Sequence, residues 1–251
     1  MTVPAMRKFT VPEAHTTYPP IGNIYVGTSR VRPAYEIDMP DAMTFTGKNL
    51  FDSETFLREG ERFSTAPEEL AIQLDYERKG INPRSDAATA LNDLFGRNAE
   101  KRYIWQWTSN FLCVPEGNEN PEQPDIVING IRYWIRKYGN RINSVDVIED
   151  QVLVPEGGVV PRTKDFEDVW DTVHGIPHTT SNKAPYTEYE NHTTHFLFDP
   201  NEKEVAVARR SDWHDDHHDC LAVVAHYRRS SANSLDGFCP VRGSIPKMIK
   251  E

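Results

Sequence analysis

The chain has 251 residues, a formal net charge of −10, 38% hydrophobic residues and 26% charged residues. This composition supports a hydrophobic core and excludes a disordered polymer, and the acidic balance excludes a general attraction of nucleic acid to the whole surface. Three cysteines are too few for a disulfide scaffold, no apolar run approaches the roughly 18 residues of a membrane-spanning helix, and the first residues lack the apolar stretch of a secretory signal. We therefore expect no membrane contact, and a cytoplasmic location or, for a viral protein, a place in the virion.

The first segment, residues 1–50, contains six prolines and shows no helical periodicity, so we predict an extended Pro-rich arm. Helical signals follow this arm. Serine and threonine are good helix N-caps. Helices are therefore predicted to begin after Ser53, after Ser64 or Thr65, and after Ser85.

Strand patterns occupy the middle of the chain. Aromatic residues at every second position predict a strand over residues 102–108. The dipeptide Asn129-Gly130 tolerates the positive φ angles of a type I′ turn, so we predict a β-hairpin over residues 125–137. Another strand is predicted over residues 145–154, and it ends at a Pro-Glu-Gly-Gly sequence.

The second half of the chain begins with a predicted helix over residues 164–174. Its signal is the spacing i, i+3, i+4, i+7 of Phe166, Val169, Trp170 and Val173. Two strands then flank Asp199-Pro200-Asn201 and are predicted to form a second hairpin over residues 195–209. The apolar run at residues 220–227 predicts a buried strand, although its period alone does not separate a strand from a helix.

Strands and helices are segregated along the chain rather than strictly alternating, which favours an α+β fold over a doubly wound fold. We therefore expect a mainly antiparallel sheet built from hairpins, with a few short helices, many loops and the extended N-terminal arm. The expected organisation is an arm over residues 1–50, a single α+β domain over residues 51–227 and an irregular C-terminal tail over residues 228–251.

Histidine is unevenly distributed, since eight of the nine histidines lie between residues 174 and 226. Their densest part is residues 211–220, which read SDWHDDHHDC. Imidazole and carboxylate are the usual ligands of zinc, iron and manganese. If residues 195–209 form a hairpin, the histidines at its two ends lie side by side at one rim of the sheet. The candidate ligands of a divalent metal (Zn, Fe or Mn) are then His192, His195, His214, Asp216 and His218.

A metal site of this kind predicts a metal-dependent hydrolase of a phosphorylated or nucleotide substrate. A metal-bound water would be the nucleophile, and Glu190 or Asp212 would be the base. Arginines bind oxyanions bidentately, so the flanking arginines are candidates for substrate binding. These residues are Arg209, Arg210 and Arg228. The alternative is a solvated surface loop in which histidine and aspartate stabilise one another and bind metal only adventitiously.

A second constellation combines cations and aromatic rings between residues 97 and 141. If Ile131, Tyr133 and Ile135 face the core, Trp134 lies outward between two arginines. Such a surface suits single-stranded nucleic acid, in which cations track phosphates and rings stack on bases, or a protein partner. The candidate contact residues are Arg102, Trp105, Arg132, Trp134, Arg136 and Lys137. The competing functional hypothesis is therefore a non-catalytic subunit that binds nucleic acid or assembles with like protomers, including a component of a viral or phage particle.

Overall fold

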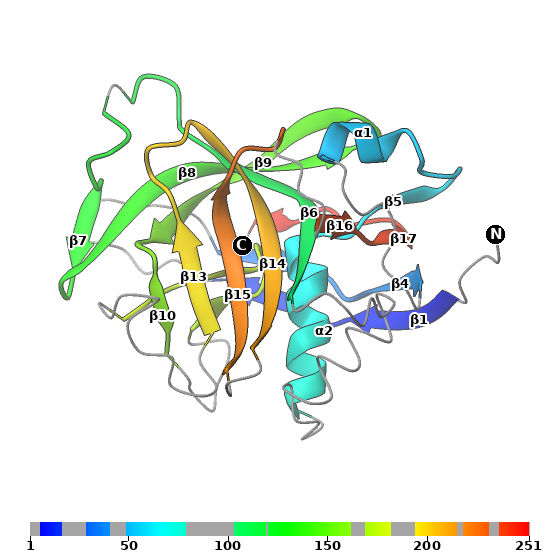
Figure 1. Cartoon of the computed structure of the whole chain (residues 1–251). Coiled ribbons are helices and arrows are strands. Elements are labelled where there is room, and N and C mark those ends of the chain that lie inside the picture. The colour runs from blue at the N-terminus through cyan, green and yellow to red at the C-terminus, as the bar shows by residue number, and fades with distance from the viewer. Residues whose placement is uncertain are drawn as a thin grey trace.

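The computed structural model describes residues 6–16, 29–40, 49–78, 103–118, 120–161, 169–181, 194–214, 218–230 and 236–250. Within these ranges the chain forms mostly antiparallel strands in several sheets, together with two short helices (Figure 1). The prediction of an α+β fold with mainly antiparallel sheet, few helices and many loops is therefore confirmed.

The largest sheet in the described part of the chain has nine strands. Seven follow the order β10-β13-β15-β14-β6-β8-β7, with β16 beside β6 and β9 beside β8. These strands are β6 (Tyr103–Cys113), β7 (Ile126–Ile128), β8 (Ile131–Ile142), β9 (Val145–Pro155), β10 (Gly158–Val160), β13 (Thr194–Phe198), β14 (Glu204–His214), β15 (His218–Tyr227) and β16 (Asp236–Phe238).

Two smaller sheets bring the ends of the chain together. One has the order β1-β4-β17-β5 and contains β1 (Met6–Val11), β4 (Tyr35–Pro40), β5 (Glu61–Phe63) and β17 (Pro240–Arg242). The other has the order β18-β3-β2 and contains β2 (Ala14–Thr16), β3 (Arg30–Arg32) and β18 (Ile249–Lys250). In its described parts, the extended arm is thus paired as strands. The prediction of an irregular tail is wrong, because strands of two or three residues are too short to show a period in the sequence.

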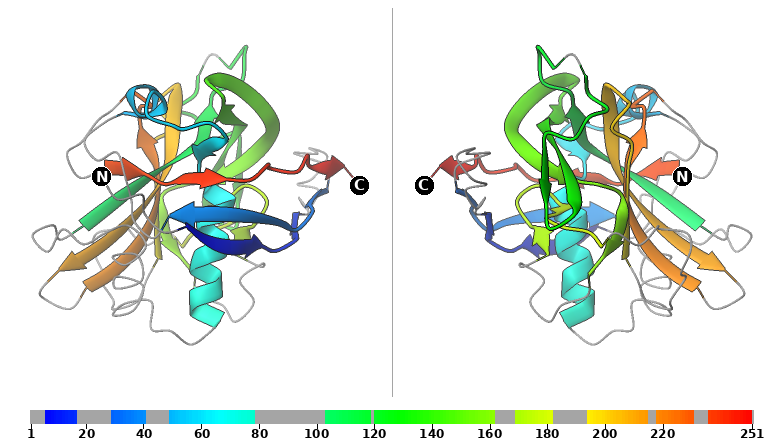
Figure 2. Two further views of the ribbon diagram at one scale, coloured as in Figure 1. Left: turned by 90° about the vertical axis from the view of Figure 1, so that its right-hand side faces the viewer. Right: turned by 90° about the vertical axis from the view of Figure 1, so that its left-hand side faces the viewer.

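Helix α2 (Ala66–Arg78) lies between the large sheet and the sheet that contains β1, β4 and β17 (Figure 2). Leu70 and Leu74 pack into the main core with residues of the large sheet. Ala71 and Ile72 pack on the other side, in a cluster that includes Val241 of β17. The helix therefore buries apolar side chains on two sides and holds the two sheets in one body.

Of the two caps predicted for α2, Ser64 and Thr65, the structure uses Thr65. The Thr65 hydroxyl accepts a hydrogen bond from the backbone N–H of Glu68 (3.4 Å), and the Glu68 carboxylate accepts one from the backbone N–H of Thr65 (2.8 Å). This reciprocal pair is a capping box. Arg62 and Tyr35 also donate hydrogen bonds to the carboxylate, so Glu68 joins α2 to β5 and to β4.

The predicted cap of the first helix is displaced by about one turn. Helix α1 (Leu50–Glu54) begins after Asn49, whose side chain accepts a hydrogen bond from the backbone N–H of Asp52 (2.9 Å). Ser53, the predicted cap, lies inside this helix and is buried. Asparagine and serine are equally good caps, and only the residues around them decide which one is used. The third predicted helix, after Ser85, lies outside the described residues.

The helix predicted over residues 164–174 is wrong in its described part. Trp170–Asp171 is strand β11, and it pairs with β12 (Ile176–Pro177) across a tight turn. The Asp171 carboxylate accepts hydrogen bonds from the backbone N–H groups of Val173 and His174, and such bonds compete with helix formation. Val169, Trp170 and Val173 are nevertheless buried as the apolar spacing indicated. Phe166 lies outside the described residues.

The hairpin around Asn129-Gly130 is confirmed. Both turn residues have positive φ angles, 52° and 83°, and Ile128 of β7 is the partner of Ile131 in β8. Residues 145–154 also form a strand as predicted, and β9 runs antiparallel to β8 along nearly its whole length.

The second predicted hairpin, over residues 195–209, is wrong. Strand β13 pairs with β10 and with β15, to which it is parallel, while β14 pairs with β15 and β6. The apolar strand β15 therefore lies between β13 and β14. A strand rich in Ala and Val is stabilised most where it has neighbours on both edges, and this explains why it displaces the short local pairing.

We predict that Glu68→Gln lowers the free energy of unfolding by about 3–5 kcal/mol, because it leaves the buried Arg62 guanidinium without its charged partner. Denaturant unfolding monitored by tryptophan fluorescence measures this loss. Glu59→Gln, at an exposed position, is the control and is expected to change stability by less than about 0.5 kcal/mol. A loss below about 1 kcal/mol for Glu68→Gln would contradict the role of this carboxylate.

Candidate functional site

The β8–β9 hairpin ends in a two-residue turn that lies against helix α1. Asn143 and Ser144 adopt positive φ angles of 50° and 63°, and Ile142 is paired with Val145, as in a type I′ turn. The Ser144 hydroxyl donates to Glu54 of α1 (3.1 Å), and Arg141 donates to the same carboxylate (2.7 Å). These bonds hold α1 against the end of the hairpin.

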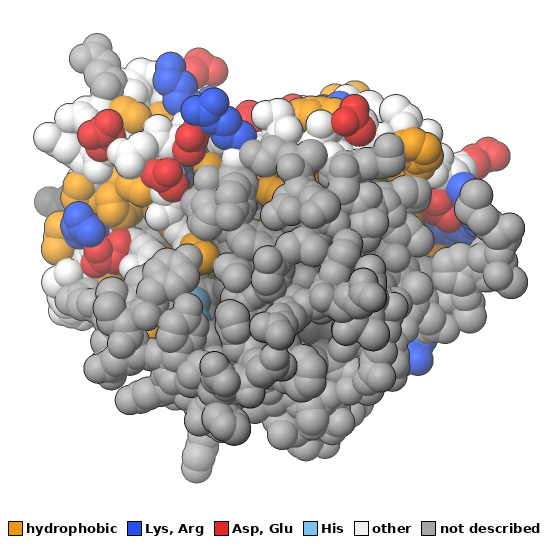
Figure 3. Space-filling view, viewed as in Figure 1, with side chains coloured by type: hydrophobic (Ala, Val, Ile, Leu, Met, Phe, Trp, Pro, Cys, Tyr) orange, Lys and Arg blue, Asp and Glu red, His pale blue; other side chains and the backbone are white. Residues whose placement is uncertain are grey.

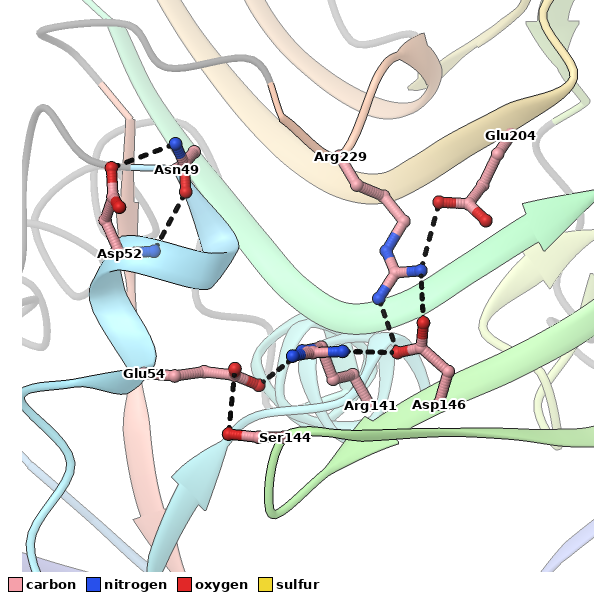
Figure 4. Close-up of polar contacts among 8 residues, drawn as sticks. All are labelled: Asn49, Asp52, Glu54, Arg141, Ser144, Asp146, Glu204 and Arg229. Atoms are coloured by element: carbon pink, nitrogen blue, oxygen red, sulfur yellow. Dashed lines mark hydrogen bonds and ion pairs between the residues drawn. The ribbon is translucent and has the colours of Figure 1, made fainter.

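Two arginines and three carboxylates form an ion cluster at this contact (Figure 4). Asp146 lies between the two arginines, since Arg229 donates to it twice (2.7 and 3.0 Å) and Arg141 donates once (2.9 Å). Arg229 also donates to Glu204 (3.0 Å), and Arg141 to Glu54. The hydrogen bond from Arg229 is the main reason why the pKa of Asp146 is lowered.

Aromatic rings cover the guanidinium groups of this cluster. The Phe51 ring lies 4.8 Å from the Arg141 guanidinium and 5.3 Å from that of Arg229. Phe111 lies 4.1 Å from the Arg229 guanidinium as well. The charges of both guanidinium groups are thus compensated by carboxylates and rings of the same chain, which leaves little of their charge for an external anion.

Large apolar side chains beside this cluster are exposed to solvent. Val145, Val147 and Ile148 at the start of β9 are 60%, 43% and 48% exposed, and Phe51 and Phe56 in and after α1 are 39% and 49% exposed. The space-filling view shows hydrophobic side chains along the upper rim of the molecule, over α1 and the β8–β9 hairpin (Figure 3). We name these five side chains the α1–hairpin surface.

A shallow groove of about 480 Å³ adjoins the α1–hairpin surface. Phe51, Asn201–Glu204 and Arg228–Ser230 line it. Arg228, a predicted substrate-binding residue, is exposed there and donates to Glu202 (2.9 Å). The groove carries nearly balanced charge, because each of its described arginines has a carboxylate partner.

The structure separates the predicted metal ligands of the histidine cluster. His195 in β13 is the partner of Ala222 in the middle of β15, whereas His214 is the partner of His218 at the first position of β15. With strands about 4.8 Å apart and about 3.3 Å per residue, the backbones of His195 and His214 lie on the order of 16 Å apart. The prediction of one metal site containing both residues depended on the hairpin over residues 195–209. Since this hairpin does not form, the structure gives no geometric support for such a site.

The remaining predicted catalytic and metal residues are placed as follows. His195 is buried, and burial lowers its pKa. The backbones of Arg209, Arg210 and Asp212 lie in β14 opposite Val223, Ala222 and Cys220 of β15. Glu190, His192 and Asp216 lie outside the described residues. In the part of the chain that the structure describes, no group of three or more His, Cys, Asp or Glu side chains is arranged to hold a metal ion.

The orientation predicted for the basic and aromatic side chains between residues 97 and 141 is wrong in β8, because Trp134 and Arg136 are buried. Trp134 is only 2% exposed and packs edge-on against Phe198, with ring centroids 5.6 Å apart. Arg136 is 1% exposed and donates to the backbone carbonyls of Pro121 and Pro200. Strand β8 is covered on both faces here, so alternation along the strand does not identify an outer face.

The other residues of that surface contribute little free charge. Arg132 is exposed but paired with Glu156 (2.8 Å), and Lys137 is paired with Glu116 (3.4 Å). Arg102 lies outside the described residues, and Trp105 is described only as a backbone position of β6. The correction removes the central tryptophan and one arginine from the predicted contact surface.

A buried histidine that the sequence analysis did not select has two acidic neighbours. The Nδ1 atom of His174 lies 2.6 Å from Asp171, and its Nε2 atom lies 3.5 Å from Asp150, which in turn accepts a bond from Arg30 (2.7 Å). Burial by itself lowers the pKa of His174, but the two aspartates outweigh burial and raise this pKa to about 9. A charged imidazole without solvent access is not a general base at neutral pH, so this cluster stabilises the fold. The spacing Asp171-x-x-His174 was its only local signal.

Comparison with other proteins assigns this chain to no family. No protein-family model matches this chain, and no match was found among curated proteins or among solved structures. Neither of the helices in the described ranges is long and apolar enough to cross a membrane. The candidate site therefore rests on its geometry.

We predict that His174 makes stability depend on pH. Its folded-state pKa of about 9 exceeds the ordinary value of about 6.5, so its stabilisation is complete below pH 6.5 and is lost as pH rises through 9. Denaturant unfolding between pH 6.5 and 9.5 is expected to show a decline on the order of 3 kcal/mol that His174→Gln removes. The exposed His15→Gln is expected to retain the decline. Parallel pH profiles for the wild type and His174→Gln would disprove the assignment.

Proposed function

We propose that this protein is a non-catalytic assembly subunit whose copies associate through the α1–hairpin surface. The observation that carries this proposal is the combination of exposed apolar side chains with arginines already paired inside the chain. Protein interfaces have an apolar core enriched in aromatic residues and arginine, inside a polar rim. A nucleic-acid surface needs cations that are free to meet phosphates, and the described arginines of this surface are not free.

The strand edge at this surface supports association between identical copies. Among the described strands, β9 pairs only with β8, and the proposed contact uses its other edge at residues 145–148, where no described strand is paired with it. Two copies of one edge can pair antiparallel about a twofold axis, which places Val145 and Val147 of one copy against those of the other. The ion cluster is nearly neutral, with two arginines against three carboxylates, so the overall charge of −10 is not concentrated at the contact.

We predict that Val147→Asp weakens self-association at least tenfold, because it introduces a charge into the centre of the proposed interface. Sedimentation velocity of the full chain from about 1 to 100 μM measures this change. Val127→Asp is the matched control, since Val127 is 58% exposed on β7. A wild type that remains monomeric throughout this range, or equal effects of both variants, would overturn the proposal.

A second candidate function, the metal-dependent hydrolase, has one supporting observation. His214 and His218 are Cα partners where β14 meets β15, and such partners lie about 4.5–5.5 Å apart. Two histidines at this spacing suit one zinc ion, with further ligands required from other segments. In this candidate, Asp212 or Glu190 would act as base, and Arg209, Arg210 and Arg228 would bind the anionic substrate.

We predict for this candidate that untagged protein binds about one zinc ion per chain, and that the double variant His214→Ala/His218→Ala loses it. Equilibrium dialysis against micromolar Zn²⁺ with metal analysis measures the stoichiometry. His15→Ala removes the histidine that lies outside the cluster and is expected to leave zinc binding unchanged. Absence of zinc from the wild type under these conditions would rule this candidate out.

A further inference from the structure

The turn of the β8–β9 hairpin carries backbone strain that the Asn129-Gly130 turn avoids. At the second position of the two turns, Gly130 has a φ angle of 83° and Ser144 a φ angle of 63°. Glycine adopts positive φ angles without steric cost, whereas the Cβ atom of serine makes the same conformation unfavourable. Serine at position 144 is therefore a local disadvantage, and such residues persist only where the surrounding structure holds them.

The partner of Ser144 also occupies a locally unfavourable position. Glu54 is the last residue of α1, and its side chain is only 10% exposed. The carbonyl groups at a helix C-terminus disfavour a negative charge, and the last turn of α1 contains no basic residue that would offset it. Both ends of the bond between Ser144 and Glu54 thus depart from local preferences. Departures of this kind are expected where a bond serves a function rather than the local fold.

This bond fixes the orientation of the Glu54 carboxylate (Figure 4). The Ser144 hydroxyl donates to Oε2 (3.1 Å), while Nε of Arg141 donates to Oε1 (2.7 Å). One donor on each oxygen keeps the carboxylate from rotating, and both donors belong to the end of the β8–β9 hairpin. The serine side chain has far fewer rotamers than the arginine side chain, which makes it the more rigid of the two donors.

The angle between α1 and the hairpin sets the direction of two exposed aromatic rings. Phe51 in α1 is 39% exposed, and Phe56, which follows the helix, is 49% exposed. Leu50 and Ser53 bury one side of this five-residue helix, and the bond at Glu54 holds its C-terminal end. A surface that is prearranged for its partner loses less conformational freedom on binding and therefore binds more tightly.

We propose that Ser144 is a positioning residue, which prearranges the α1–hairpin surface for a second copy of the chain at a cost in backbone strain. The role of Ser144 rests on the proposed assembly function, because its bond sets the affinity of that contact. Removal of the hydroxyl then weakens self-association, and relief of the strain does not restore it. With a merely structural role, the strength of association would instead follow the stability of the chain.

Two variants separate the bond from the strain. Ser144→Ala removes the hydroxyl and keeps the strained conformation, whereas Ser144→Gly removes both. In denaturant unfolding, we expect a higher midpoint for Ser144→Gly than for Ser144→Ala. In sedimentation velocity of the full chain, we expect both variants to self-associate at least fivefold more weakly than the wild type. A midpoint of Ser144→Gly at or below that of Ser144→Ala, or wild-type association in Ser144→Gly, would overturn the proposal.

Hydrogen exchange over residues 50–57 tests the positioning of α1 separately from association. At a concentration where the wild type is monomeric, we expect this segment to exchange at least threefold faster in both variants. The reporting amides are those of Ser53, Phe56 and Leu57, which donate to backbone carbonyl groups in or next to α1. Gly130→Ser is the matched control, since it places a strained serine in the turn between β7 and β8, and it is expected to leave exchange over residues 50–57 and association unchanged.

The two measurements distinguish failure of the inference from failure of the proposed function. Unchanged exchange over residues 50–57 in both Ser144 variants would overturn the role of Ser144, even if the wild type associates. A wild type that stays monomeric throughout the concentration range would overturn the assembly function, and with it the effect of Ser144 on affinity. In that case, faster exchange in both variants would still support the positioning of α1 by Ser144.

Discussion

The buried carboxylate of Glu68 is the interaction on which the arrangement of the two main sheets depends. It is removed from water, so its charge must be compensated within the chain. Arg62 supplies the opposite charge, Tyr35 donates a hydroxyl, and the backbone of Thr65 closes the capping box. These partners come from β5, β4 and the start of α2, so one side chain sets the position of the helix relative to the N-terminal strands.

The same principle recurs wherever arginine enters the interior. Arg30 pairs with Asp150, and Arg229 with Asp146, while Arg136 donates to backbone carbonyls of two loops. A buried guanidinium is tolerated only when several acceptors converge on it, which makes each of these arginines a constraint on segments that are distant in the chain. The acidic composition of the protein supplies the necessary carboxylates.

The pairing of the arginines determines which part of the described surface is suited to binding a partner. Arg141 and Arg229 form ion pairs with carboxylates of the same chain, so their charges are not available to a phosphate group. Apolar side chains of α1 and β9 beside these arginines remain exposed to water. Exposed apolar groups favour association with a protein surface.

Local features were predictable because their causes lie within a few residues. The turn at Asn129-Gly130 follows from the φ angles that these two residues tolerate, and the cap at Thr65 follows from its spacing to Glu68. The burial of Val169, Trp170 and Val173 was predictable as well, although their helix was not, since a tight turn brings apolar residues together at the same spacing. Of the candidate site, only Arg228 of the groove was selected from the sequence, as a substrate-binding candidate, and the α1–hairpin surface had no signal in the sequence.

By itself, the sequence therefore determined the class of fold, the best local turns and caps, and much of the core composition. The tertiary structure alone decided the strand order and the direction of the side chains in β8. Strand β15 lies between β13 and β14 because its apolar residues gain neighbours on both edges, and no local pattern reports that gain. Trp134 is buried because Phe198, from a distant segment, covers its face of the sheet. Partners such as Arg30 and Asp150 are 120 residues apart in the chain, so only folding shows which charges neutralise one another and which surface is left exposed.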